Sequence, residues 1–290
     1  MKKIVFLVIL LLPVIAQAAD ARLFLCSGAG AYLSGREIKT RVVVSSGGRP
    51  GINAAETILT YDPKKIKVRK IAKENSIFGL WPTEPKFDPV KGIIKFAGGT
   101  TTPYMDSAGS IFSIYFTPLV NGNVDIDMSS TTSSILTADG RANNILRDAD
   151  GLGIIVGNSS VVANAESLRR KMSGRILLQV EKDGRSWYVY PSDNRRYFLG
   201  RPLDAFNLMR KLGLGTTHKY ITSHIDGLFP KLVSGKILLD VEDSGKAYYI
   251  NPVDMKAYYL GRPKDAFAIM RQLGLGINNK EIKKIPDWAI

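Results

Sequence analysis

Hydrophobic and polar residues alternate through residues 33–68, and this alternation predicts two β-strands joined by a turn. In the first strand, Lys39 and Arg41 lie on the polar face of a period-two pattern. The Gly- and Pro-containing run 45–51 predicts a loop, and the second strand ends at Asp62-Pro63, because proline has no N–H to donate. The apolar face of the first strand consists of Ile38, Thr40, Val42 and Val44.

The same period continues through the first half of the chain. Residues 111–117 and 124–128 alternate in the same way, and turn signals recur at Asn121-Gly122 and Asp139-Gly140. Many short strands with no amphipathic helix predict a β-sandwich over residues 19–157. We interpret the fold class as mainly β, a sandwich followed by two small α+β units.

Several pieces of this region, in order, resemble the cohesin domain of bacterial extracellular scaffolds over residues 30–156. They are a valine-rich strand, Tyr61-Asp62-Pro63, the strand 66–71, the segments 92–97 and 109–116, Asn121-Gly122-Asn123, and Thr137-Ala138-Asp139-Gly140. The resemblance implies a jelly-roll sandwich of about nine strands, an architecture shared with carbohydrate-binding modules. It also implies a dockerin-like protein partner docking on one sheet face.

An internal duplication fills the second half. Residues 173–215 align without gaps to residues 234–276, and 25 of the 43 aligned positions are identical. Each copy predicts three strands and then a helix that begins at Pro202 or Pro263, since proline suits the first helical turn. We place repeat 1 at residues 173–230 and repeat 2 at residues 231–290. The small and polar stretch before them, residues 158–172, predicts a linker.

Aromatic and basic residues supply the candidate ligand contacts. Two stretches of the sandwich predicted as loops, 76–90 and 99–109, contain Trp81 and Tyr104, which could stack on a sugar or anchor a protein. In the repeats, aromatic residues beside cations could bind an anionic cell-wall polymer. The alternatives are that these aromatics belong to the core and that the cations form a solvated basic face. The repeat candidates are Tyr188, Arg196, Arg201, Tyr249 and Arg262.

Charge and the N-terminus bear on location. The net charge is +14, and residues 158–290 hold 22 Lys and Arg against 13 Asp and Glu, so the repeats favour acidic partners. Lys2-Lys3, an apolar run and Ala16-Gln17-Ala18 predict a signal peptide over residues 1–18. We therefore expect a secreted or cell-surface protein, with no transmembrane segment after cleavage and no nucleic-acid partner. Cys26, the single cysteine, lies in an apolar run and is expected to be buried.

Recognisable catalytic motifs are absent from the sequence. His218 and His224 have no counterparts in the other repeat, and no nucleophile elbow, HExxH or phosphate-binding Gly loop occurs. Asp148 to Gly151 hints at a calcium loop, but Leu152 and Ser159 stand where ligands are needed, so an exposed turn is favoured. We expect no enzyme, cofactor or metal, and a scaffold protein that binds carbohydrate or a protein partner. The alternative is an accessory module or weak hydrolase in polysaccharide degradation.

Overall fold

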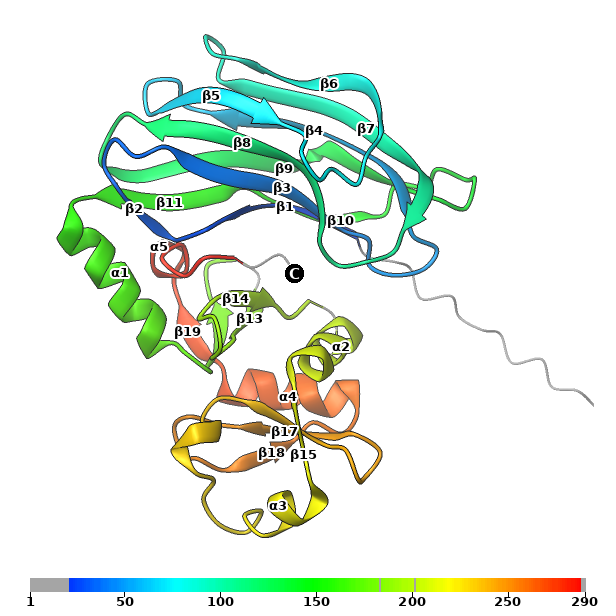
Figure 1. Cartoon of the computed structure of the whole chain (residues 1–290), viewed down its shortest axis with the longest axis vertical. Coiled ribbons are helices and arrows are strands. Elements are labelled where there is room, and N and C mark those ends of the chain that lie inside the picture. The colour runs from blue at the N-terminus through cyan, green and yellow to red at the C-terminus, as the bar shows by residue number, and fades with distance from the viewer. Residues whose placement is uncertain (1–20, 183, 201, 288–290) are drawn as a thin grey trace, which may run out of the picture.

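The computed structural model describes residues 21–182, 184–200 and 202–287, and its first part is a sandwich of two β-sheets (Figure 1). The five-stranded sheet has the order β10 (Leu146–Asp150), β1 (Ala21–Ser27), β3 (Ile38–Ser45), β8 (Gly109–Pro118), β5 (Ile66–Ala72). The six-stranded sheet has the order β2 (Ala31–Leu33), β11 (Leu152–Gly157), β9 (Gly122–Thr137), β4 (Ile52–Tyr61), β7 (Ile93–Tyr104), β6 (Leu80–Asp88). The predicted fold class is confirmed.

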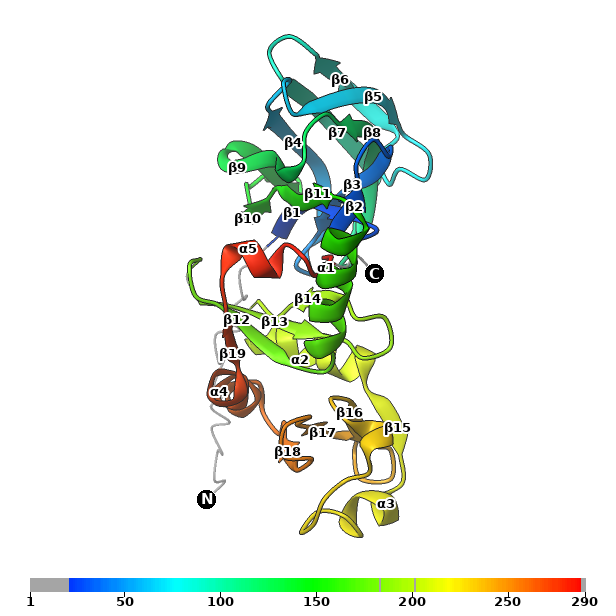
Figure 2. The ribbon, with the colours of Figure 1, turned by 90° about the vertical axis from the view of Figure 1, so that its left-hand side faces the viewer.

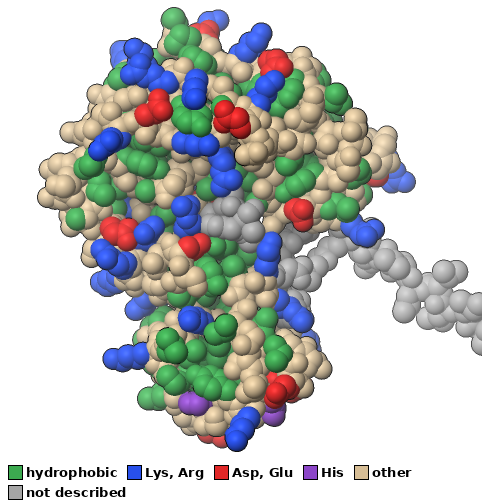
Figure 3. Space-filling view, in the orientation of Figure 1, with side chains coloured by type: hydrophobic (Ala, Val, Ile, Leu, Met, Phe, Trp, Pro, Cys, Tyr) green, Lys and Arg blue, Asp and Glu red, His purple; other side chains and the backbone are tan. Residues whose placement is uncertain are grey.

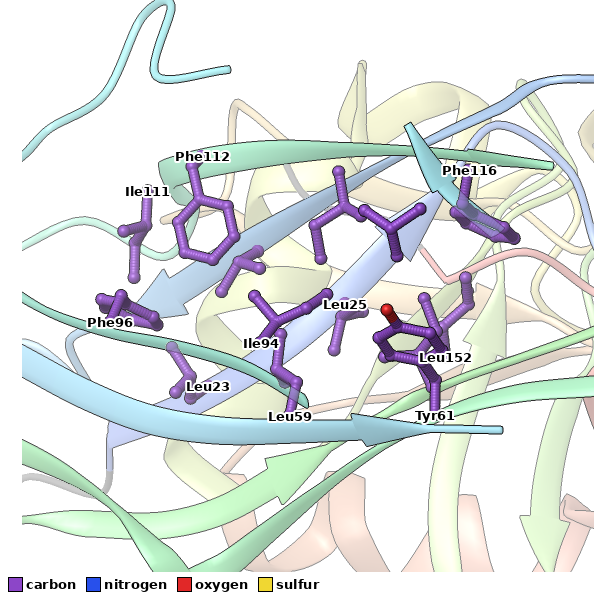
Figure 4. Packing of buried hydrophobic residues seen from close by; sticks show 14 of the residues in the cluster. Leu23, Leu25, Leu59, Tyr61, Ile94, Phe96, Ile111, Phe112, Phe116 and Leu152 are labelled. Atoms are coloured by element: carbon purple, nitrogen blue, oxygen red, sulfur yellow. The ribbon is translucent and has the colours of Figure 1, made fainter. Parts of the chain in front are cut away.

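The sandwich core lies between the two sheets, as Figure 4 shows. Leu23 and Phe112 point inward from the five-stranded sheet and meet Leu59 and Ile94 from the six-stranded sheet. All four side chains are fully buried, and burying each one contributes about 1.5–3 kcal/mol. The alternation in β3 is therefore the pattern of a strand with one face in this core.

Two segments predicted as loops are strands instead. Residues 80–88 form β6, an edge strand, and β7 continues to Tyr104, so the predictions at 76–90 and 99–109 were wrong. Pro82 and Pro85 suggested a loop, but an edge strand tolerates proline because one side of its backbone has no pairing partner. The pairing of β6 with β7 is irregular in two places, which accommodates them.

The segment that joins the two halves is helical. Residues 158–172, predicted as a linker, contain α1 (Ser159–Lys171), whose first turn is capped by the Asn158 side chain accepting from the Val161 N–H. Figure 2 shows α1 running from the sandwich along the first repeat. Small polar residues suggested an irregular chain, but Leu168 and Met172 pack into the core of repeat 1 and hold the helix there.

Each repeat contains the three predicted strands and the predicted helix, together with a further strand and short helices. The elements of repeat 1 are β12 (Ile176–Gln179), β13 (Arg185–Val189), β14 (Arg196–Phe198), α2 (Pro202–Leu212), β15 (Leu214–Thr216) and α3 (His218–Thr222). Those of repeat 2 are η1 (Lys231–Val233), β16 (Ile237–Asp240), β17 (Lys246–Ile250), β18 (Ala257–Tyr259), α4 (Pro263–Leu273), β19 (Leu275–Ile277) and α5 (Asn279–Ile282).

The two repeats exchange their last strands. β19 of repeat 2 pairs with β12, completing the sheet β14-β13-β12-β19, and β15 of repeat 1 pairs with β16, completing the sheet β15-β16-β17-β18. The helices α2 and α4 contact each other, and one hydrophobic cluster contains residues from both repeats. The folded units therefore cross the sequence boundary at residues 230 and 231.

Two reciprocal hydrogen bonds lock the centre of the repeat pair. The buried Tyr188 hydroxyl donates to the Gly235 carbonyl at 2.6 Å, and the buried Tyr249 hydroxyl donates to the Gly174 carbonyl at 2.8 Å. The two glycines lie back to back with positive φ angles of 75° and 69°. A Cβ atom on Gly174 would lie 2.5 Å from the Gly235 Cα, so only glycine fits there.

We expect Gly174→Ala to destabilise the repeat pair strongly. The left-handed backbone costs an alanine about 1–2 kcal/mol, and overpacking against Gly235 adds about 1–3 kcal/mol. The matched control is Gly184→Ala, where φ is +62° and a Cβ would meet open space. Urea unfolding of both variants measures the difference, and equal losses would contradict this account of the contact.

Candidate protein-binding surface and interdomain junction

The outer face of the six-stranded sheet presents a strip of apolar side chains. Leu80 of β6 and Ile58 of β4 are 54% and 43% exposed, although both lie in strands. Leu80 pairs with Gly99 of β7, which pairs with Ala54, and Ala54 pairs with Leu136 of β9. These positions face away from the core because side chains alternate along each strand.

Charged residues border this apolar strip. Lys86 and Lys95 form a cross-strand pair beside Ile58, and Asp127 pairs with Thr60 farther along the sheet. Glu56 lies in β4 between Ala54 and Ile58, and its carboxylate accepts a hydrogen bond from the Ser134 hydroxyl at 3.0 Å. An apolar centre with a charged border is the usual composition of a protein-binding surface.

The outer face of the five-stranded sheet is partly covered by the repeats. Phe24, Cys26 and Val43 are buried on this face, and the Cys26 thiol donates to the Asp287 carbonyl at 3.2 Å. Arg195 of repeat 1 donates to the carbonyls of Ser27 and Gly28 at 3.2 and 3.0 Å. The expectation that Cys26 is buried is confirmed, and a partner has no access to this part of the sheet.

An ion network joins the sandwich to repeat 1 at this junction. The Arg22 guanidinium lies 2.7 Å from an Asp150 carboxylate oxygen, and 3.4 Å from oxygens of Asp148 and Asp287. Lys182 and Arg185, from the first hairpin of repeat 1, lie 2.6 and 2.7 Å from Asp150. Arg185 also pairs with Asp148. The charges therefore link three segments that are far apart in sequence.

Aromatic rings enclose the same guanidinium. Its central carbon lies 4.4 Å from the ring centre of Phe198, 4.6 Å from that of Phe24 and 5.3 Å from that of Trp187. Phe24 belongs to the sandwich, and the other two rings belong to repeat 1. Cation–π contacts strengthen when water is removed, so burial favours this arrangement of Arg22.

The network shifts the pKa values of Asp148 and Asp150 in opposite directions. Burial alone would raise the pKa of Asp150, but Arg22, Arg185 and Lys182 outweigh it and hold that pKa well below its usual range. Burial and the neighbouring Asp150 raise the pKa of Asp148. Asp150 is therefore the carboxylate that carries the ionic contact.

The structure corrects the interpretation of residues 148–151 as an exposed turn. Asp148 and Asp150 lie in β10, and their side chains are only 12% and 13% exposed. Their spacing of two places both carboxylates on one face of the strand, toward the repeats. The two aspartates are close together in the sequence, but their cationic partners lie more than 30 residues away in either direction and could not be recognised from it.

The sandwich candidates Trp81 and Tyr104 lie against the core. Trp81 is half-buried and packs edge-on against Phe78 and Phe96, with ring centres 6.1 and 6.4 Å apart. Tyr104 is half-buried too, and its hydroxyl accepts from the Ala108 N–H at 3.1 Å. Both rings therefore pack against the sandwich core.

The repeat candidates have separate locations. Tyr188 and Tyr249 are buried in the shared core, so the prediction that they contact a polymer was wrong. Arg196 is also buried in the junction, where its guanidinium stacks on Trp187 at 4.7 Å and donates to the Ile282 carbonyl at 2.5 Å. Arg262 is exposed and pairs with Asp265 at 2.8 Å, and Arg201 lies outside the described residues.

Among the described residues, three side chains that could bind a metal ion already have other polar partners. The ligand atoms of His218, Asp240 and Asp243 lie within 4.8 Å of one another. The His218 Nδ1 atom lies 2.7 Å from Asp240, and Lys246 lies 2.6 Å from Asp243. We therefore assign no metal to this group. None of the helices in the described part of the chain has the length and apolar character to cross a bilayer.

A family model matches the sandwich part of the chain. Residues 29–156 match the family model of the cohesin domain, as the resemblance predicted. No curated protein matches the chain.

Similar solved structures include three cohesins. The solution structure of a cohesin from Clostridium acetobutylicum has 16% identity and a TM-score of 0.40, and the match covers 49% of this chain and 94% of that one. A non-cellulosomal cohesin from Archaeoglobus fulgidus has 14% identity and a TM-score of 0.37, with coverage of 50% and 97%. A cohesin–dockerin complex from Clostridium thermocellum has 16% identity and a TM-score of 0.39, with coverage of 47% and 99%.

We expect Asp150→Asn to cost about 3–5 kcal/mol of unfolding free energy, because removing one partner leaves buried cations uncompensated. The control is Asp265→Asn at the exposed pair with Arg262, which should cost less than about 1 kcal/mol. Urea denaturation followed by tryptophan fluorescence measures both, since Trp187 lies at the junction. A loss at Asp150 no larger than at Asp265 would show that the network contributes little.

The Asp150 contribution should depend on pH. Since its pKa is lowered in the folded protein, the stabilisation is present above the ordinary carboxyl pKa of about 3.9 and is lost as pH falls below it. The difference in unfolding free energy between the unmodified chain and Asp150→Asn should shrink from pH 6 toward pH 3. A difference that stays constant over this range would exclude Asp150 as the titrating group.

Proposed function

We propose that the cohesin domain at residues 29–156 is a non-catalytic recognition module that binds a dockerin-like protein. The apolar strip on the outer face of β6, β7 and β4 is the observation that carries this proposal. The family match supports a dockerin-like partner, and the exposed strip provides a surface of suitable chemistry.

The side chains of this strip favour a protein over a polysaccharide. Leu80 and Ile58 are aliphatic and offer no ring on which a sugar could stack. The rings first considered for carbohydrate, Trp81 and Tyr104, support the core. A protein partner can bury aliphatic side chains within a polar border, here formed by Glu56, Lys86 and Lys95.

The proposal places the protein outside the cytosol, either secreted or at the cell surface. The charge and apolar run of residues 1–18 support export, although they lie outside the described residues. Attachment through basic repeats has less support, because Arg196 is used in the junction and Arg262 is paired with Asp265. The role proposed for repeat 1 is to hold the sandwich in a fixed orientation.

Replacing both Ile58 and Leu80 with aspartate should weaken dockerin binding by about 30-fold or more, the effect of losing at least about 2 kcal/mol at the centre of an interface. Surface plasmon resonance of the full chain over a panel of immobilised dockerin modules measures this. Leu119→Asp is the matched control, since Leu119 is 52% exposed and lies in a loop beyond the strip.

Two results would contradict the proposed function. Dockerin binding that survives the double substitution would place the partner elsewhere on the domain. Retention of the full chain on insoluble cellulose, with no binding to any dockerin of the panel, would favour the alternative of a carbohydrate-binding accessory module.

A further inference from the structure

The two repeats carry aromatic pairs at equivalent positions. Trp187 of β13 pairs in register with Phe198 of β14, and their ring centres are 5.1 Å apart. Sixty-one residues later, Tyr248 of β17 pairs in register with Tyr259 of β18, with ring centres 5.2 Å apart. The duplication has therefore preserved the geometry of this face.

In repeat 1 this face is occupied. Trp187 is only 3% exposed, because it packs in a cluster with Leu177 and Ile285 of the repeat pair and the Arg22 guanidinium of the sandwich approaches both rings. Arg196, one strand away, stacks on Trp187 from repeat 1 itself. The face acts as an acceptor for an arginine presented by a neighbouring β-sheet.

In repeat 2 the equivalent face is open. Tyr259 is 47% exposed, and no cation of the described residues lies over the ring of Tyr248 or Tyr259 at a cation–π distance. Ala257 stands at the position of Arg196, so the cation that repeat 1 supplies to its own ring is missing. The pair retains its geometry without the guanidinium that its counterpart binds.

Two exposed leucines lie in the segment that packs on this sheet. Leu228 and Leu232 are 65% and 82% exposed, and they precede Phe229 and Val233, which pack against Leu238 and Ile250 of β16 and β17. Figure 3 shows hydrophobic side chains gathered on the lower lobe, which contains β17 and β18 of repeat 2 together with β15 and α3 of repeat 1. Exposed apolar groups of this kind are typical of interaction sites.

Charge in the adjacent hairpin also differs. Asp243 aligns with Lys182, one of the two hairpin cations through which repeat 1 meets the acidic β10 strand. The repeat 2 hairpin therefore has one cation, Lys246, which pairs with Asp243 at 2.6 Å, where repeat 1 has two, so it repels a basic partner less.

We propose that the Tyr248–Tyr259 face of repeat 2 docks a second protein by accepting one of its arginine side chains over the two rings, as Trp187 and Phe198 accept Arg22. This surface is separate from the cohesin strip, so the chain has two binding faces. The inference rests on the occupied face of repeat 1 and does not depend on the dockerin proposal.

The test is a titration of the full chain, with 13C-labelled tyrosine rings, observed by NMR. The probe is N-acetyl-arginine amide, and N-acetyl-citrulline amide is its neutral counterpart of similar shape. We expect saturable chemical-shift changes at the Tyr248 and Tyr259 rings. The affinity for the arginine probe should be about two- to fivefold higher than for the citrulline probe, the range for exposed cation–π contacts.

Substitutions then locate the response. Tyr259→Ala should abolish it, whereas Tyr115→Ala should leave it intact, because the Tyr115 ring already holds Lys39 and Lys70 at 5.4 and 4.5 Å. Equal affinity for citrulline, or the absence of any saturable shift, would overturn the proposal. Saturation by cellohexaose, or tighter binding of choline than of the arginine probe, would overturn it in favour of a sugar or small-cation site.

Discussion

The burial of one guanidinium, that of Arg22, determines how the two halves of this chain meet. Removing such a charge from water is costly, and the cost is offset only where acidic groups and polarisable rings surround it. Here the acids come from β10 and the C-terminal segment, and the rings come from β1 and repeat 1. Because no single segment supplies all of these partners, the arrangement exists only when sandwich and repeats are both folded.

The strand exchange extends this dependence to repeat 2. β19 completes the sheet of repeat 1, and the segment that follows it ends at Asp287, which lies beside Arg22. Loss of either repeat would therefore remove a strand from the other, and loss of repeat 2 would also remove Asp287 from the junction. This connection leaves two surfaces exposed, the strip around Leu80 and Ile58 on the six-stranded sheet and the face of repeat 2 around Tyr259. Figures 1 and 2 show these two parts of the chain at opposite ends of the molecule.

Local pattern in the sequence predicted many of the elements but not their contacts, and it missed β6 and α1. Alternation in residues 38–44 identified β3, and the 61-residue offset identified the repeats, since both depend on neighbours in sequence. The junction was missed because Arg22 meets acids 128 and 265 residues away. Tyr188 and Tyr249 were misassigned for a related reason: adjacent aromatics in a strand face opposite sides, and only tertiary packing shows which side is the core.

Comparison of the two copies is informative where the single sequence was not. Residues that the repeats share, such as Gly174 with Gly235 and Tyr188 with Tyr249, form the common core and the reciprocal hydrogen bonds. Residues that differ, such as Arg196 with Ala257 and Lys182 with Asp243, lie where repeat 1 contacts the sandwich. Since the core requirements are the same in both copies, these differences reflect the neighbour of each face. A face that has the same aromatic pair but lacks the arginine of its counterpart has the chemistry of a surface that suits a different neighbour.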